Sequence, residues 1–85
     1  MEICNAALMD TVKNIIMYKT NSSNVHSIGY DNKNHILKVI FQGGGTYIYL
    51  GVPEFLWTEL INSESKGKYL QENIIRNKKY QYLKL

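Results

Sequence analysis

The chain has 85 residues, so it can form at most one domain with a modest hydrophobic core. Its formal net charge is +3, and no apolar run reaches the roughly 18 residues that a membrane-spanning helix needs. A single cysteine can form neither an intrachain disulfide nor a zinc site, so we expect no metal and no cofactor. Residues 1–18 lack the pattern of a secretory signal, which predicts a cytoplasmic protein without membrane contact.

The charge is unevenly distributed along the chain. Residues 65–85 contain six basic side chains and one acidic side chain, a net charge of +5, which leaves −2 for residues 1–64. The six basic residues are Lys66, Lys68, Arg76, Lys78, Lys79 and Lys84. This basic C-terminal quarter fits an anionic partner and fits a solvated lysine-rich tail equally well, so both interpretations stay open.

The first predicted element is an amphipathic helix over residues 5–18, with Asn5 as its candidate N-cap. Its apolar stripe consists of Leu8, Val12, Ile15 and Ile16. The polar stretch 20–24 interrupts the helical period. We therefore divide the chain into an N-terminal helix at 1–20, with an expected role in oligomerisation, and a domain at 21–85.

Three strands are predicted next, at residues 25–30, 36–42 and 46–52. Polar and glycine-rich turns join them into an antiparallel meander. With residues 43–45 as the loop of the second hairpin, Phe41 lies opposite Tyr47.

Both faces of this predicted sheet are apolar. One face carries Leu37, Val39, Phe41, Tyr47 and Tyr49, and the other carries Ile36, Ile40, Ile48 and Leu50. A sheet with one wet face would alternate apolar and polar residues, so two layers must cover this one. Helices that follow the sheet can cover one face. The N-terminal helix or a second subunit would cover the other, and we favour self-association into a homo-oligomer.

Two helices are predicted after the sheet. Pro53 suits the first turn of a helix that runs to Ile61. A second helix begins near Ser65, with Ser65 or Ser63 as its cap, and ends before Asn77. The predicted fold class is α+β: a three-stranded antiparallel β-meander followed by two helices, with an extra N-terminal amphipathic helix.

Several short motifs follow one another between residues 22 and 82. They are Ser22-Ser-Asn-Val-His-Ser-Ile-Gly-Tyr-Asp31, Leu37-x-Val39-x-Phe41, Tyr47-x-Tyr49, Val52-Pro53 and Ser65-x-Gly67-Lys68-Tyr69. In this order and spacing the chain resembles the KTSC domain, which is named after the C-terminus of some lysyl-tRNA synthetases and also occurs as small free-standing proteins in bacteria and phages. The resemblance implies a nucleic-acid- or RNA-binding module and implies no catalysis, so we expect a protein that is not an enzyme.

The chain departs from the family pattern after Tyr69. The family continues with Phe-Asn and later Ile-Arg, whereas this chain has Leu70-Gln71 and reaches Ile75-Arg76 with one residue more. A role of the family asparagine or arginine therefore does not carry over directly to this segment.

The start of the second helix is a candidate phosphate site. Free backbone N–H groups, the positive end of a helix and lysine side chains together attract anions. We expect Lys68, with the backbone around Ser65 and Gly67, to contact a ligand phosphate. A simple helix cap with solvated lysines is the alternative explanation.

Other residues extend this candidate site. Arg76 would supply a second cation about 12 Å further along the helix axis. Tyr69 and Asn73, four positions apart, would line the same groove and contact a base or ribose. Tyr47 and Tyr49 would stack on bases, as exposed aromatic residues of sheet-based RNA binders do, unless they form core beneath the helices.

The expected function is non-enzymatic binding. His26 and His35 have no organised carboxylate or cysteine partner, so nothing indicates a catalytic centre. The favoured hypothesis is an oligomeric phage-type protein, in the host cytoplasm, that sequesters a small phosphorylated nucleotide such as a cyclic nucleotide or an ADP-ribose-type immune signal. Binding of RNA or another single-stranded nucleic acid is the alternative, and an assembly or adaptor role without a ligand is the second alternative.

Overall fold

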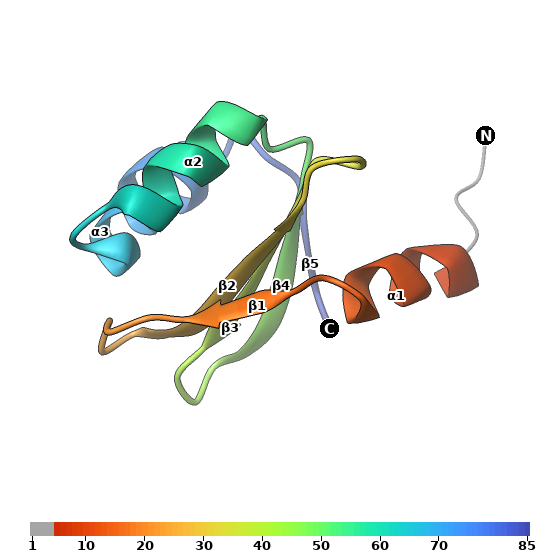
Figure 1. Cartoon of the computed structure of the whole chain (residues 1–85), viewed down its shortest axis with the longest axis horizontal. Coiled ribbons are helices and arrows are strands. Elements are labelled where there is room, and N and C mark those ends of the chain that lie inside the picture. Colours follow the sequence, from red (N-terminus) through yellow and green to blue (C-terminus); the bar gives the residue numbers. More distant parts are fainter. Residues whose placement is uncertain (1–4) are drawn as a thin grey trace.

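The computed structural model describes residues 5–85, with the side chains of residues 5–8 left out, and Figure 1 shows its elements. In chain order they are α1 (Asn5–Lys13), β1 (Met17–Lys19), β2 (Val25–Asp31), β3 (Ile36–Phe41), β4 (Gly45–Leu50), α2 (Glu54–Asn62), α3 (Lys66–Leu70), η1 (Gln71–Ile75, a π-helical turn) and β5 (Tyr82–Lys84). The predicted cap residue Asn5 and Leu8 of the predicted apolar stripe are outside the residues whose side chains are described. Among residues 5–85, no helix is both long and apolar enough to cross a bilayer.

The sheet has five antiparallel strands in the order β1-β2-β3-β4-β5. The α+β class and the central meander of β2, β3 and β4 confirm the prediction, but the predicted number of three strands is wrong. The two edge strands β1 and β5 have three residues each, which is too short to show an alternating pattern. Residues 82–84, which the composition assigned to a basic tail, pair with β4 from Tyr47 to Tyr49.

The N-terminal helix is shorter than the predicted range 5–18. It ends at Lys13, and the chain then continues as strand β1. Ile15 and Ile16 fit a helical stripe, but β-branched residues also suit extended backbone. Tertiary contacts favour a strand over a longer helix in this segment. Met17 pairs with Gly29 of β2, and the Lys38 ammonium donates a hydrogen bond of 3.2 Å to the Val12 carbonyl in the last turn of α1.

The register of the second hairpin differs by two residues from the prediction. Phe41 pairs with Gly45, and Val39 pairs with Tyr47. The loop therefore consists of residues 42–44, and Gly45 begins β4 with a φ of +90°, a conformation that glycine adopts without strain. Because the shift is even, each side chain stays on its predicted face.

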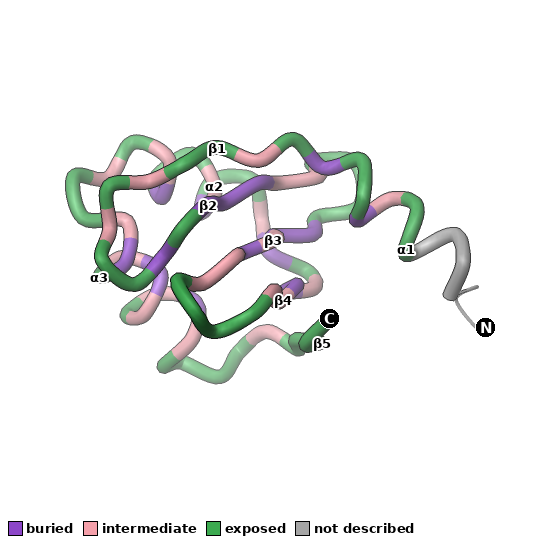
Figure 2. The backbone as a smooth tube through the Cα atoms, turned by 90° about the horizontal axis from the view of Figure 1, so that it is seen from below, coloured by how far each residue is buried: buried purple, intermediate pink, exposed green. Residues whose placement is uncertain are grey.

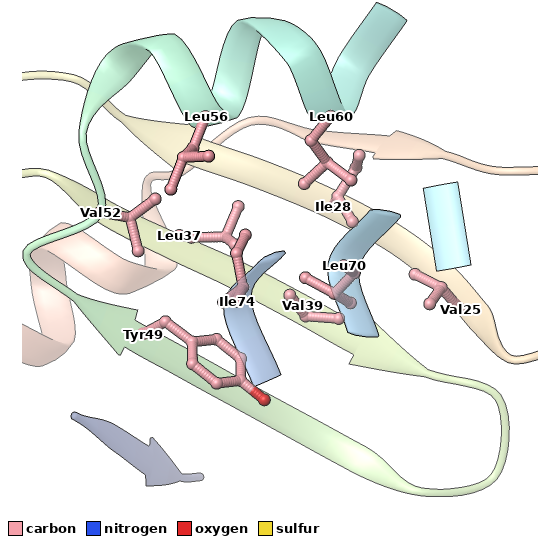
Figure 3. Packing of buried hydrophobic residues seen from close by; sticks show 10 residues of the cluster. All are labelled: Val25, Ile28, Leu37, Val39, Tyr49, Val52, Leu56, Leu60, Leu70 and Ile74. Carbon is pink, nitrogen blue, oxygen red and sulfur yellow. The ribbon is translucent and has the colours of Figure 1, made fainter. Parts of the chain in front are cut away.

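The main core lies between one face of the sheet and the C-terminal helices. Figure 3 shows Ile28, Leu37 and Val39 of the strands packed beneath Leu56 and Leu60 of α2, with Leu70 and Ile74 completing the layer. In Figure 1, α2 and the α3–η1 segment lie together on one side, and α1 lies apart from them. Figure 2 shows the buried positions concentrated on β2 and β3, whereas β5 is exposed.

The opposite face has its own small core. Val12 and Ile15, from α1 and the connection after it, are buried against Ile36 and Ile48. The sequence leaves two alternatives for the layer on this face, the N-terminal helix or a second subunit. The N-terminal segment of the same chain lies there. Ile16, which was predicted to share the apolar stripe, points outward and is 70% exposed.

The C-terminal helix contains a change of helical type. The Arg76 N–H donates to the Gln71 carbonyl at 2.8 Å, which is the i to i−5 bond of a π-turn. A π-turn accommodates one extra residue within a helix, and the surplus residue predicted from the family pattern falls in this segment. The predicted cap Ser65 forms no capping hydrogen bond, and Ser63 instead accepts the Ser65 N–H at 3.2 Å.

Candidate functional site

An open groove of about 1170 Å³ runs along the β4–β5 edge of the sheet. Its walls are the β3–β4 hairpin tip, strands β4 and β5, turn η1 and the connection between η1 and β5. Five aromatic residues line it: Phe41, Tyr47, Tyr49, Tyr80 and Tyr82. We call this feature the aromatic groove.

The rings of the groove pack against one another along the sheet. The ring centroid of Tyr82 lies 5.9 Å from that of Tyr47 and 5.8 Å from that of Tyr49. Phe41 meets Tyr47 edge to face at 5.5 Å. Tyr49 is buried, and this burial raises the pKa of its hydroxyl. Tyr82, by contrast, is 60% exposed and presents its ring to solvent.

The two tyrosines that the sequence singled out therefore have different surroundings. Tyr49 belongs to the margin of the core, as Figure 3 shows, and Tyr47 is half-buried in the groove wall. Of the two predicted alternatives, the core position is confirmed for Tyr49, and ligand contact by Tyr47 stays a prediction.

The groove is electropositive. Lys78 and Lys79 line it, and the Lys79 ammonium lies 5.8 Å from the Tyr80 ring centroid. Beside the groove the Lys84 ammonium lies 5.9 Å from the Tyr47 centroid, within the range of a cation–π contact. No carboxylate is among the described residues that line the groove. The site thus combines aromatic faces with cations.

A second, polar hollow of about 360 Å³ lies at the start of α3. Residues 21–24 of the β1–β2 turn and residues 64–68 line it, so three predicted site residues, Ser65, Gly67 and Lys68, do come together here. A Cβ atom on Gly67 would lie 2.7 Å from the Ser22 hydroxyl oxygen, so close packing against the turn accounts for this glycine.

The charge of the polar hollow is mixed. The Lys66 ammonium donates to the Ser63 carbonyl at 2.9 Å, and Glu64 adds a negative charge to the wall. Lys68 is exposed. A phosphate would therefore meet one uncommitted lysine and one carboxylate.

The remaining predicted residues lie elsewhere. The Tyr69 hydroxyl donates to Glu59 at 2.6 Å, and burial, followed by this hydrogen bond, raises its pKa to about 12. The Asn73 amide donates to the Tyr69 carbonyl at 3.1 Å. Arg76 is exposed and lines neither the aromatic groove nor the polar hollow. The predicted site is thus distributed over three places rather than one.

Sequence reasoning missed the residues that build the groove wall from the C-terminus. These are Lys78, Lys79, Tyr80 and Tyr82, with Lys84 beside the Tyr47 ring. A signal was present, since Tyr82 and Lys84 are two positions apart, as residues on one face of a strand are. The many basic residues of segment 65–85, five lysines and one arginine, concealed this strand pattern.

Among residues 5–85, no three histidine, cysteine, aspartate or glutamate side chains lie close enough together to hold a metal ion.

Comparison with known proteins shows the family. The sequence model of the KTSC domain matches residues 21–83. The chain belongs to the KTSC domain family. The match starts after β1, so α1 and β1 precede the KTSC region in this chain.

One solved structure and two curated proteins are similar to this chain. A crystal structure of a KTSC domain protein from Yersinia pestis matches with a TM-score of 0.78 and 35% identity, covering 84% of this chain and 97% of that one. A protein of Tsukamurella paurometabola is 37% identical over 54 residues, 64% of this chain and 81% of the relative. An uncharacterized protein of Stutzerimonas stutzeri is 31% identical over 64 residues, 75% of this chain and 89% of the relative.

Proposed function

We propose that this KTSC domain is a non-enzymatic module that binds single-stranded RNA in the aromatic groove. The observation that carries the proposal is the composition of that groove. Five aromatic rings and two lysines line it, a third lysine, Lys84, lies beside its Tyr47 ring, and no carboxylate is among the described residues that line it. Single-stranded nucleic acid is commonly bound by aromatic rings that stack on successive bases and by cations that follow the phosphates. Tyr82 offers the most exposed ring for a base.

The size of the groove supports a strand over a single nucleotide. Small-molecule sites usually measure about 300–1000 Å³ and bury most of the ligand. This groove is larger, at about 1170 Å³, and open. The sequence favoured a small ligand because an oligomer was expected to enclose it. With α1 covering Ile36 and Ile48 in the same chain, that reason carries less weight.

A small phosphorylated nucleotide is the second candidate, at the polar hollow. Its volume of about 360 Å³ lies within the usual range of small-molecule sites, and it brings Ser65, Gly67 and Lys68 together. On this hypothesis the protein would sequester the nucleotide. Glu64 in the same wall opposes phosphate binding, which is why we place this candidate second.

The salt dependence of RNA binding tests the first proposal. Three lysines on the phosphates give a slope of about −2 in log affinity against log salt, or a roughly 20-fold loss between ~50 and ~200 mM salt. Replacing Lys84 by Ala reduces that loss to about sevenfold, because one phosphate contact disappears. Fluorescence anisotropy with a labelled eight-nucleotide RNA measures both values.

Two further variants locate the site. Tyr82→Ala weakens binding by about 1–3 kcal/mol through the lost stacking contact and leaves the salt slope unchanged. Lys68→Ala, which lies in the polar hollow, is the matched control and leaves RNA affinity unchanged. If Lys68→Ala weakened binding and Lys84→Ala did not, the polar hollow would replace the groove as the site.

A further inference from the structure

All three glutamines of the chain line the aromatic groove. Gln42 lies at the hairpin tip, Gln71 begins η1, and Gln81 immediately precedes β5. They come from three separate segments, and the fold brings them to one surface. No carboxylate and no arginine is among the described residues that accompany them there. The neutral polar side chains of the groove are thus carboxamides placed among aromatic rings.

These glutamines have fixed backbones. The Gln42 N–H donates to the Asn24 carbonyl at 2.9 Å, and the Gln81 carbonyl accepts the Leu50 N–H at 2.8 Å. The Gln71 carbonyl accepts the π-turn bond from Arg76, also at 2.8 Å. Each side chain therefore starts from a well-defined position on the groove wall.

The side-chain amides of the same three glutamines form no hydrogen bond to the described residues of the chain. Within residues 5–85, no hydrogen bond joins the amide of any of the three glutamines to another residue. Four asparagines behave differently and donate their amides to the chain itself: Asn34, Asn62, Asn73 and Asn77. The amides in the groove are therefore available to a ligand, and Gln71 is the half-buried one of the three.

The chemistry of a carboxamide selects among bases. It presents a donor beside an acceptor, which matches the N6 donor and N7 acceptor of adenine in a two-bond pair. Guanine is read best by the paired donors of arginine, and cytosine by a carboxylate. Among the described residues that line the groove there is neither an arginine nor a carboxylate.

We infer that Gln71, flanked by Gln42 and Gln81, makes the groove select adenine-containing single strands. The inference rests on the proposed RNA binding and adds a base preference to it. Gln71 is the specificity-determining residue because it is the least exposed of the three and its backbone is held by the π-turn. The aromatic rings supply affinity for any base, and the Gln71 amide supplies the preference for adenine.

The test compares labelled octamers of adenylate, uridylate and cytidylate by fluorescence anisotropy. The parent protein binds the adenylate octamer at least roughly fivefold more tightly than the other two, the low end for one two-bond base contact. In Gln71→Met, which keeps the length of the side chain and removes its hydrogen bonds, affinity for uridylate stays within about twofold and the adenylate preference falls to about twofold. A melting curve checks that the variant is folded.

The outcomes separate the inference from the proposed function. If no octamer binds, the proposed RNA binding is wrong and the inference with it. If the octamers bind equally, or if Gln71→Met keeps the full adenylate preference, RNA binding stands and the glutamine selects nothing, because stacking alone would explain the preference. Should Gln71→Met unfold, Gln71→Glu replaces it, since a carboxylate loses the donor and the same loss of adenylate preference is expected.

Discussion

Gly29 shows how one residue determines where the N-terminal segment lies. A Cβ atom there would lie 2.6 Å from the Met17 sulfur and 2.7 Å from an Ile15 methyl carbon, and closer still to the Ile16 carbonyl oxygen. Only a glycine therefore lets β1 and the preceding turn pack against β2. The closest contact is to backbone, which cannot rotate away.

Replacing Gly29 by Ala is expected to lower the free energy of unfolding by about 1–3 kcal/mol or more, because the added methyl group overpacks this contact. Urea denaturation followed by Trp57 fluorescence measures the change. Gly44→Ala is the matched control: it has the same effect on the unfolded chain, and its added methyl group meets only side-chain carbons of Phe41, the nearer at 3.2 Å and the other at 4.0 Å. Equal stability of the two variants would show that the β1 segment does not pack tightly on β2.

Among the elements, the α3–η1 helix contains the surplus residue that the sequence analysis predicts relative to the KTSC pattern. Leu70 before the π-turn at Gln71–Ile75 and Ile74 within it are both buried. A helix without such a turn would rotate every following side chain by about 100°. The turn thus lets the sequence gain a residue without losing its core.

Deleting Glu72, which is exposed within the π-turn, should convert the segment to a regular α-helix with little change in stability, within about 1 kcal/mol. Deleting Thr58 from the regular helix α2 is the control. That deletion turns Leu60 out of the core and should cost about 2–5 kcal/mol. Circular dichroism melting curves compare the two, and a Glu72 deletion as damaging as the Thr58 deletion would contradict the account of η1.

How well the elements follow from the sequence depends on their length. Strands β2–β4 and helix α2 have enough residues for their periodicity to be decisive. The edge strands do not, and the pairing of β1 depends on a glycine in another strand. Among the candidate sites, the grouping at the start of α3 was predicted from local chemistry, but the aromatic groove joins residues 41–50 with residues 71–83. No local pattern predicts that contact.

At the scale of the whole molecule, the face under α1 is only partly covered. Ile36 and Ile48 are buried there, while Leu83 and Leu85 remain 45% and 47% exposed. We propose that this surface holds an even-numbered homo-oligomer, in which a second copy covers the leucines. Multi-angle light scattering should give a multiple of 9.9 kDa, reduced by Leu83→Lys. A parent protein that is monomeric at micromolar concentration would contradict this proposal.

The central claim is that RNA binds in the aromatic groove. Backbone amide chemical shifts, recorded while an unlabelled adenylate octamer is added to ¹⁵N-labelled protein, test it most directly. We expect the largest shifts at residues 78–84 and at Tyr47 and Gln71, with residues 65–68 nearly unchanged. Shifts confined to residues 65–68, or none at any amide, would contradict the claim.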